Sequence, residues 1–286
     1  NDIGDELKTF SLGLNGLIEF NFSFALSDEL VNDDKAYILF TLPNGRQQRQ
    51  LISDAQFVNG KYRLTCGVYA YEMTQKVKFN VVNGKGVVGK TYSYSIEDYC
   101  NKPLNANDDV SLKIKPLVKS MLNYGGYAQD EFDKYLDNKA YKNVKSEFEE
   151  TMNLLSYTNF QDYMAKVETT DSNFSARSIT LVLEEGTSLR VYLNVNNPNL
   201  IINTKAYIDG VETSILQDSR GYYLNIPSIQ GNKLDVEHVF EVGNLRLKCS
   251  ALSYVYTCLK RSTVENDINV AKAIYLYSKE SKAIFG

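Results

Sequence analysis

The stretch FSLGLNGLIEFNFSF, residues 10–24, indicates how the first half of the chain folds. After a turn, every second residue is apolar, so one face of the segment carries a row of large side chains: Ile18, Phe20, Phe22 and Phe24. This period of two is typical of a strand with one buried face. The stretch therefore predicts a half-buried β-strand that follows a turn.

The same pattern returns in the second half of the chain. In SITLVLEEGTSLRVYLNV, residues 178–195, a turn again precedes an alternating row, formed by Leu189, Val191, Leu193 and Val195. Further on, YSYSIEDYCNKP (92–103) aligns with SALSYVYTCLKR (250–261), which matches Ser95 with Ser253 and Cys100 with Cys258. Both segments predict a strand that leads into a short helix, capped in the first copy by Ser95 and Asp98.

Each half then closes on an amphipathic helix. VKSMLNYGGYAQDEF (118–132) superposes on AKAIYLYSKESKAIF (271–285), so that three residues recur: Lys119, Tyr124 and Phe132 as Lys272, Tyr277 and Phe285. Gly125 and Gly126 weaken a helix by about 1 kcal/mol each relative to alanine. They therefore predict close packing of the first helix on its sheet, and the repeated order of elements predicts an old duplication.

Turn sequences separate the expected strands: LPNGR (42–46), VNGKY (58–62), VNGKG (82–86) and YIDGVE (207–212). Asn-Gly and Pro-Asn-Gly supply the backbone angles of tight hairpins. We predict a mainly β fold with α-helices (α+β), made of two tandem antiparallel β-sandwich-like domains of six or seven strands, each closed by a helix. The first domain is residues 1–132, a helical linker is 133–168, and the second domain is 169–286.

The segment GKGVVGKT, residues 84–91, matches the phosphate-binding pattern G-x-x-x-x-G-K-[ST]. A phosphate-binding loop requires a helix that opens at its Lys-Thr end. The residues that follow Lys90 alternate instead, with Tyr92 and Tyr94 on one face. We predict a hairpin here and no nucleotide site.

Composition and charge argue against a nucleic-acid partner and against insertion into a membrane. The chain has 35 acidic and 31 basic residues, a net charge of -4, and therefore lacks the basic excess that nucleic acid attracts. No apolar run approaches the ~18 residues of a membrane span, so membrane insertion is not expected. The four cysteines have no C-x-x-C spacing and are predicted to be mostly buried thiols: Cys66, Cys100, Cys249 and Cys258.

Catalytic residue types are scarce. The only histidine, His238, lies in the strand-like VEHVFEV, and no zinc-binding set of cysteine and histidine occurs. Paired carboxylates occur at Glu149 and Glu150 on a charged helix, and at Glu184 and Glu185 in a turn. Glycoside hydrolysis needs two carboxylates held a defined distance apart across a cleft, an arrangement that the sequence neither shows nor excludes. We therefore expect no enzyme activity, no cofactor and no metal.

Tyrosine stands out among the aromatic residues, with 21 Tyr and 13 Phe but no Trp. Surface tyrosine supplies rigid contact area at low entropy cost and suits an interface, although many of these residues fill strand faces and cores. In SRGYYLN the candidate ligand contacts are Arg220, Tyr222 and Tyr223, with at least one tyrosine expected to pack in the core.

The order of several segments resembles a module that recurs in large, modular, extracellular proteins of gut Firmicutes. The segments are SLGLNGLIEFNFSFALSDEL (11–30), AYILFTLPNG (36–45), KTYSYSIEDYCNKPL (90–104), LVKSMLNYGGYAQDEF (117–132), SITLVLEEGTSLRVYL (178–193) and AKAIYLYSKESKAIFG (271–286). The resemblance covers about residues 8–286 and implies a cell-surface or cell-wall location and a role in interaction. Some such proteins of Lachnospiraceae bind immunoglobulin variable domains as superantigens.

Three functions are consistent with these observations. The first is an adhesin-type module that binds a host or bacterial surface protein, such as immunoglobulin, through a sheet edge or a tyrosine-rich face. The second is a carbohydrate-binding module that stacks sugars on tyrosine, which the lack of Trp disfavours. The third is a structural spacer that presents other domains.

Overall fold

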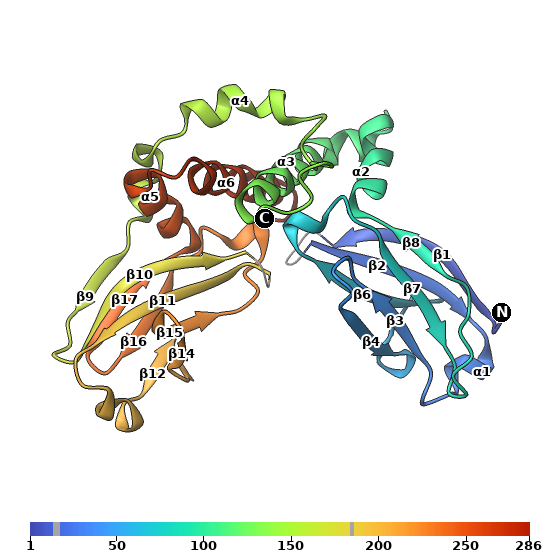
Figure 1. The fold of residues 1–286 in the computed structure, drawn as a ribbon, viewed down its shortest axis with the longest axis horizontal. Helices are drawn as coiled ribbons and strands as arrows, with labels where there is room; N and C mark the ends of the chain where they lie inside the picture. Colours follow the sequence, from blue (N-terminus) through green and yellow to red (C-terminus); the bar gives the residue numbers. More distant parts are fainter. Residues whose placement is uncertain (14–17, 184–185) are drawn as a thin grey trace.

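A computed structural model describes residues 1–13, 18–183 and 186–286. It contains four antiparallel sheets, two formed by the first half of the chain and two by the second, below a layer of helices (Figure 1). The prediction of a mixed fold with two tandem sandwich-like halves is confirmed. The turn residues 14–17 and the pair Glu184 and Glu185 lie outside the described residues.

The first half places its eight described strands in two four-stranded sheets. One has the order β1 (Asp5–Gly13), β2 (Ile18–Leu26), β6 (Lys61–Val68) and β5 (Gln56–Val58); the other has the order β4 (Gln47–Leu51), β3 (Tyr37–Thr41), β7 (Val77–Val82) and β8 (Tyr92–Tyr94). As predicted, alternate residues of β2 are buried, and Phe22 lies against Phe79 of the other sheet with ring centroids 4.0 Å apart. This contact between sheets forms the centre of the first core.

The second half repeats this strand order. One sheet has the order β10 (Phe174–Val182), β11 (Ser188–Val195), β15 (Gly221–Ile226) and β14 (Leu216–Asp218); the other has β13 (Val211–Thr213), β12 (Ala206–Ile208), β16 (His238–Val242), β17 (Leu245–Cys249) and β9 (Lys166–Thr169). Even the irregularities agree, because a bulge interrupts β1 between Leu7 and Thr9 and β10 between Ala176 and Ser178. The order of the strands therefore supports the predicted duplication.

Helices and short helical turns complete the chain. They are α1 (Asp28–Val31), η1 (Ile52–Asp54), η2 (Ala70–Glu72), α2 (Ile96–Asn105), α3 (Asp109–Phe132), α4 (Lys145–Leu154), η3 (Tyr157–Tyr163), η4 (Pro198–Asn203), η5 (Gly231–Lys233), α5 (Ala251–Arg261) and α6 (Glu265–Phe285). The long helices α3 and α6 pack together where the two halves meet (Figure 1). Tyr124 and Tyr277, which the sequence aligns with each other, stack across this contact with centroids 5.9 Å apart.

The alignment of the shorter helices needs a correction. Ser95 caps α2 and, as predicted, forms a capping box with Asp98. The equivalent cap of α5 is Ser250, whereas Ser253 occupies the third helical position, like Asp98. The match of Ser95 with Ser253 is therefore wrong by three residues, and Cys100 and Cys258 are not equivalent.

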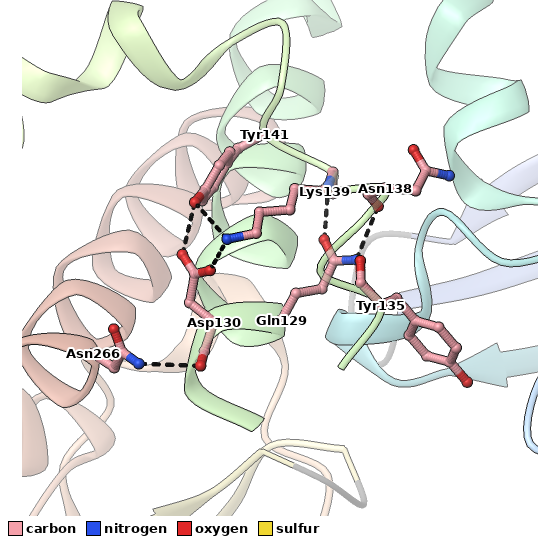
Figure 2. Close-up of polar contacts among 8 residues, drawn as sticks. Gln129, Asp130, Tyr135, Asn138, Lys139, Tyr141 and Asn266 are labelled. Atoms are coloured by element: carbon pink, nitrogen blue, oxygen red, sulfur yellow. Dashed lines mark hydrogen bonds and ion pairs between the residues drawn. The ribbon is translucent and has the colours of Figure 1, made fainter. Parts of the chain in front are cut away.

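The predicted linker packs on the first half through α3. A methyl group on Gly126 would lie 2.0 Å from Cδ1 of Tyr141, so the close packing predicted for this glycine is against the linker and not against the sheet. The side chain of Gln129 holds the linker backbone by donating to Tyr135 and Asn138 oxygens and accepting from the Ala140 N–H (Figure 2). The linker segment contains α4 and η3, as predicted, but its end forms strand β9.

Two further sequence predictions can be compared with the backbone. The residues of GKGVVGKT connect β7 and β8, which pair antiparallel, and no helix opens at Lys90, so the hairpin is confirmed.

Each half has more strands within the described residues than the six or seven expected, because strands of three residues carry no visible alternation. None of the described helices is long and apolar enough to cross a membrane.

Candidate binding face and adjoining cleft

The three predicted contact residues lie at the turn between β14 and β15 and on β15 itself. Arg220 is exposed, and its N–H donates to Oδ1 of Asp218 over 2.8 Å. Tyr222 lies on the face of β15 that carries the fully buried Leu224, so it points toward the sandwich core. Tyr223 lies on the opposite, outer face, and both tyrosines are partly exposed.

Tyr223 belongs to a cluster on the outer face of the sheet, the Tyr–Arg face, formed by Arg177, Arg190, Tyr192, Asp218 and Tyr223. Tyr192 and Tyr223 are paired across β11 and β15, with ring centroids 5.2 Å apart. The Arg190 guanidinium lies 4.6 Å from the centroid of Tyr223, and that of Arg177 lies 5.4 Å from the centroid of Tyr192. These contacts between cations and aromatic rings hold all four side chains in place.

Asp218 fixes the polar end of this cluster. The Tyr192 hydroxyl donates to its Oδ2 over 2.7 Å, and Nη1 of Arg190 lies 3.4 Å from the same oxygen. The hydrogen bond from Tyr192, followed by the backbone N–H of Arg220 and the charge of Arg190, lowers the pKa of Asp218. Asp218 therefore stays ionised and anchors both Tyr192 and Arg190, while Tyr192 is only 1% exposed.

The first half lacks this cluster, although its sheet has the same design. The bulges and the pairing of Phe22 with Leu64 and of Val191 with Leu224 fix which positions are equivalent. Ser23 then stands where the second half has Tyr192, and Arg63 where it has Tyr223. Because the fold forms without the cluster in one copy, the cluster is not a requirement of the fold.

A cleft of about 500 Å³ adjoins the Tyr–Arg face, between β10, β11 and the helices. Arg190, Tyr192, Asp218 and Arg220 form its strand side. Its helix side contains Glu131, near the end of α3, and Asp267, near the start of α6, whose carboxyl groups are hydrogen-bonded to each other. Burial, followed by this hydrogen bond and the charge of Asp267, raises the pKa of Glu131 to about 7.

The carboxyl pair is a group of hydrogen-bonding oxygens on the helix side of the cleft. Glu131, with a pKa of about 7, shares a proton with Asp267, and Asp267 also accepts from the Ser262 hydroxyl over 3.1 Å. A direct hydrogen bond brings the two carboxyl groups closer than the ~5 Å or more that separates the paired carboxylates of glycosidases. The geometry of this pair therefore fits recognition of a polar ligand better than glycoside hydrolysis.

Other residues weighed from the sequence lie elsewhere. His238 is in strand β16, as predicted, and its Nδ1 lies 2.7 Å from Oδ2 of Asp209, a partner that the sequence did not indicate. Partial burial opposes ionisation of Asp209, but hydrogen bonds from His238 and Val239 lower its pKa. Among the described residues, the His238 ring has no hydrogen bond to a hydroxyl or thiol group that it could activate as a nucleophile.

The described thiols form no disulfide, and the described acidic groups form no cluster of metal ligands. All four cysteines lie in the described part of the chain, and all are buried and free, as predicted. Across residues 1–13, 18–183 and 186–286, no three side chains of His, Cys, Asp or Glu gather closely enough to hold a metal ion.

Comparison of the chain with protein-family models and with curated proteins found no match.

Proposed function

We propose that the chain is a non-catalytic binding module that recognises a protein through the Tyr–Arg face of its second half. Tyrosine and arginine are the residue types that, with tryptophan, dominate the binding energy of protein interfaces. Here they are ordered before binding by stacking and by Asp218, so little side-chain entropy is lost on association. The observation that carries the proposal is that only one of two equivalent sheets has this cluster.

The location and the partner belong to the same proposal. The resemblance to extracellular modules of gut Firmicutes favours a cell-surface or cell-wall location and a partner such as immunoglobulin or another host or bacterial surface protein. Strand β14 forms the open edge of the sheet beside the Tyr–Arg face, so a partner could also pair with its backbone.

The proposal is tested by capture of partners from serum and intestinal mucus on the immobilised chain, followed by affinity measurement with purified candidates. Tyr223→Ala and Arg220→Ala should each weaken binding by roughly tenfold or more, as expected for interface hot spots. The matched control is Phe57→Ala, which removes an aromatic side chain that is 64% exposed in the first half and should leave affinity unchanged. Unchanged affinity in the Tyr223→Ala variant, with a correct fold, would remove the Tyr–Arg face from the proposal, and unchanged affinity in the Arg220→Ala variant would remove the adjoining turn.

A carbohydrate ligand is the second candidate, and the cleft is the observation that favours it. Glu131, Asp267 and Arg220 line the cleft and offer donors and acceptors that match sugar hydroxyls, and Tyr223 lies on the adjoining Tyr–Arg face. Recovery of mucins alone, lost after deglycosylation, would support this candidate. Failure to retain any partner or glycan would favour a spacer.

A further inference from the structure

The Tyr–Arg face carries more positive than negative charge, although the whole chain has a net charge of -4. The face and the turn that adjoins it hold one carboxylate, that of Asp218, and three guanidinium groups: Arg177, Arg190 and Arg220. The carboxylate accepts from the Tyr192 hydroxyl and forms its ion pair with Arg190. In the part of the chain that the structure describes, Arg177 and Arg220 therefore have no carboxylate of their own.

The side chain of Arg177 is held at the same turn as Arg220. Its Nη2 donates to the Arg220 carbonyl oxygen, and a methyl group on Gly221 would lie 3.5 Å from its Nη1. The ring of Tyr192 contacts the guanidinium from a second side. Because a guanidinium carries several N–H donors and this one uses a single donor within the described residues, the other donors of this exposed side chain are open to a partner.

Arg220 is also free to bind. Its side chain is exposed, lines the cleft and forms neither an ion pair nor a hydrogen bond with any residue that the structure describes. The carboxyl groups across the cleft do not compensate it, because Glu131 and Asp267 are hydrogen-bonded to each other.

The first half neutralises the charge at the position equivalent to Arg177. The bulges of β1 and β10 align Lys8 with Arg177 and Glu6 with Ser175. Lys8 forms an ion pair with Glu6 over 2.7 Å, whereas Ser175 offers Arg177 no negative charge. The fold therefore accommodates a compensated cation at this bulge, and the uncompensated charge of Arg177 is particular to the second half.

The adjoining turn differs between the halves in the same way. The pairing of β5 with β6, and of β14 with β15, aligns Gly60 with Arg220 and Val58 with Asp218. The first half thus has no charged side chain at either of these turn positions. The two free guanidinium groups occur in the copy that also has the tyrosine pair.

The surroundings of the arginines favour an extended peptide as the source of the missing negative charge. Strand β14 is the open edge of the sheet, and Leu216 on it is 40% exposed and paired with Tyr223. A peptide that pairs with the β14 backbone can place an apolar side chain on these two residues and carboxylates on the arginines. A guanidinium binds a carboxylate through two parallel hydrogen bonds, which gives the contact a defined geometry.

We propose that the partner of the Tyr–Arg face presents an extended acidic segment, whose carboxylates bind Arg177 and Arg220. This inference rests on the proposed function and adds to it the charge and conformation of the partner segment. Complementary charge speeds association and disfavours partners of like charge, so the two arginines act mainly on specificity.

The test is a nuclear magnetic resonance titration of the full ¹⁵N-labelled chain. The probes are the peptide acetyl-Glu-Glu-Val-Tyr-Glu-Glu amide, the same peptide with glutamine in place of each glutamate, and a heparin oligosaccharide. We expect the acidic peptide to shift amide signals of 175–178 and 218–223 in a saturable way and to bind about fivefold or more tightly than the glutamine peptide.

Three outcomes of this titration overturn the inference. They are no saturation by the acidic peptide up to about 10 mM, equal affinity of the two peptides, and tighter binding of heparin at the same signals. The last outcome would assign the arginines to a sulfated glycan.

Variants separate the two arginines from the general charge of the chain. Ser175→Glu gives Arg177 the carboxylate that Glu6 gives to Lys8, and it should weaken binding of the acidic peptide about twofold or more without removing an arginine. Arg177→Gln with Arg220→Gln should weaken it about fivefold or more. The matched control is Lys8→Gln, which removes the equivalent cation of the first half and should leave the affinity unchanged. An equal loss in Lys8→Gln would contradict the assignment to these arginines.

Failure of this inference can be told from failure of the proposed function. For a partner captured from serum or mucus, Tyr223→Ala tests the face, whereas Arg177→Gln with Arg220→Gln and a rise in salt test the charge. A partner that is lost in Tyr223→Ala, but keeps its affinity in the arginine variant and at high salt, leaves the proposed function standing and overturns the acidic segment.

Discussion

Glu131 links protonation to folding at the scale of a single residue. Its pKa is about 7 in the folded chain, against an ordinary 4.5, so the folded state binds more protons than the unfolded state between these values. The contribution of Glu131 to the free energy of unfolding is therefore fully favourable below about pH 4.5 and declines as the pH rises to about 7. Above pH 7 the two adjacent carboxylates repel each other.

Glu131→Gln should keep the hydrogen bond to Asp267 and remove the repulsion. We expect this variant to gain stability at pH 8 by on the order of 1 kcal/mol, since the side chain is half-buried and partly screened by solvent. Urea unfolding of both proteins at pH 5 and pH 8 measures the difference. The control Glu150→Gln should show the same change in the free energy of unfolding between pH 5 and pH 8 as the native chain. If Glu131→Gln also loses as much stability between these pH values as the native chain, the linkage is contradicted.

The cysteines make a second residue-scale prediction. Burial raises the pKa of Cys66 and of Cys249 to about 12, and that of Cys258 to about 11, while Cys100 is shifted in the same direction. Because the thiolate is the reactive form, none of the four should react with a disulfide reagent in the folded chain at pH 8. All four should react in denaturant. Fast labelling of a native thiol, located by mass spectrometry, would show that its burial is transient.

At the scale of the element, the sequence predicts well what depends on neighbours in the chain. The alternation of β2, the cap of α2 and the Asn-Gly turns are local, and each is confirmed, with Asn59 and Gly60 both at positive φ. The match of Ser95 with Ser253 is wrong because it aligns identical residues in the two segments. The capping box instead places Ser250 at the N-cap of α5 and Ser253 three residues later. Strands of three residues, such as β5 and β14, form only because a longer partner strand is present.

Gly126 gives an element-scale prediction about the linker. Gly126→Ala gains about 1 kcal/mol of helix propensity but forces Tyr141 to move, so we expect a net loss of about 1–3 kcal/mol. Chemical denaturation measures it. The control is the Tyr141→Ala variant. Adding Gly126→Ala to it should leave the free energy of unfolding unchanged or raise it. A single variant as stable as the native chain would show that the linker is not tightly packed on α3.

At the scale of the whole molecule, part of the candidate site is predictable from the sequence and part is not. Alternation along β11 places Arg190 and Tyr192 on the face opposite Leu189, and this signal was available in the sequence. The motif SRGYYLN contains Tyr223, which lies on the Tyr–Arg face, and Arg220, which lines the adjoining cleft. The carboxyl pair could not be foreseen, because Glu131 and Asp267 meet only when helices from different halves pack together.

The contact between α3 and α6 should make the two halves unfold as one unit. Tyr124 and Tyr277 are buried and stack with an angle of 11° between their rings, each contributed by one half. If the contact couples the halves, a double-mutant cycle of Tyr124→Leu and Tyr277→Leu should give a coupling energy of about 0.5–1.5 kcal/mol. Tyr124→Leu combined with Phe240→Leu, a core change within the second half, serves as the control and should be additive within about 0.5 kcal/mol.

The same samples test cooperativity when unfolding is followed by circular dichroism and by tyrosine fluorescence. Coincident transitions in the native chain indicate one unit, because each half then loses its structure together with the helix contact that buries Tyr124 and Tyr277. Two separate transitions, together with additive tyrosine variants, would mean that each half is stable alone and that the helices only join them. In that case the Tyr–Arg face would remain intact after the first half unfolds, and partner binding would persist through the first transition.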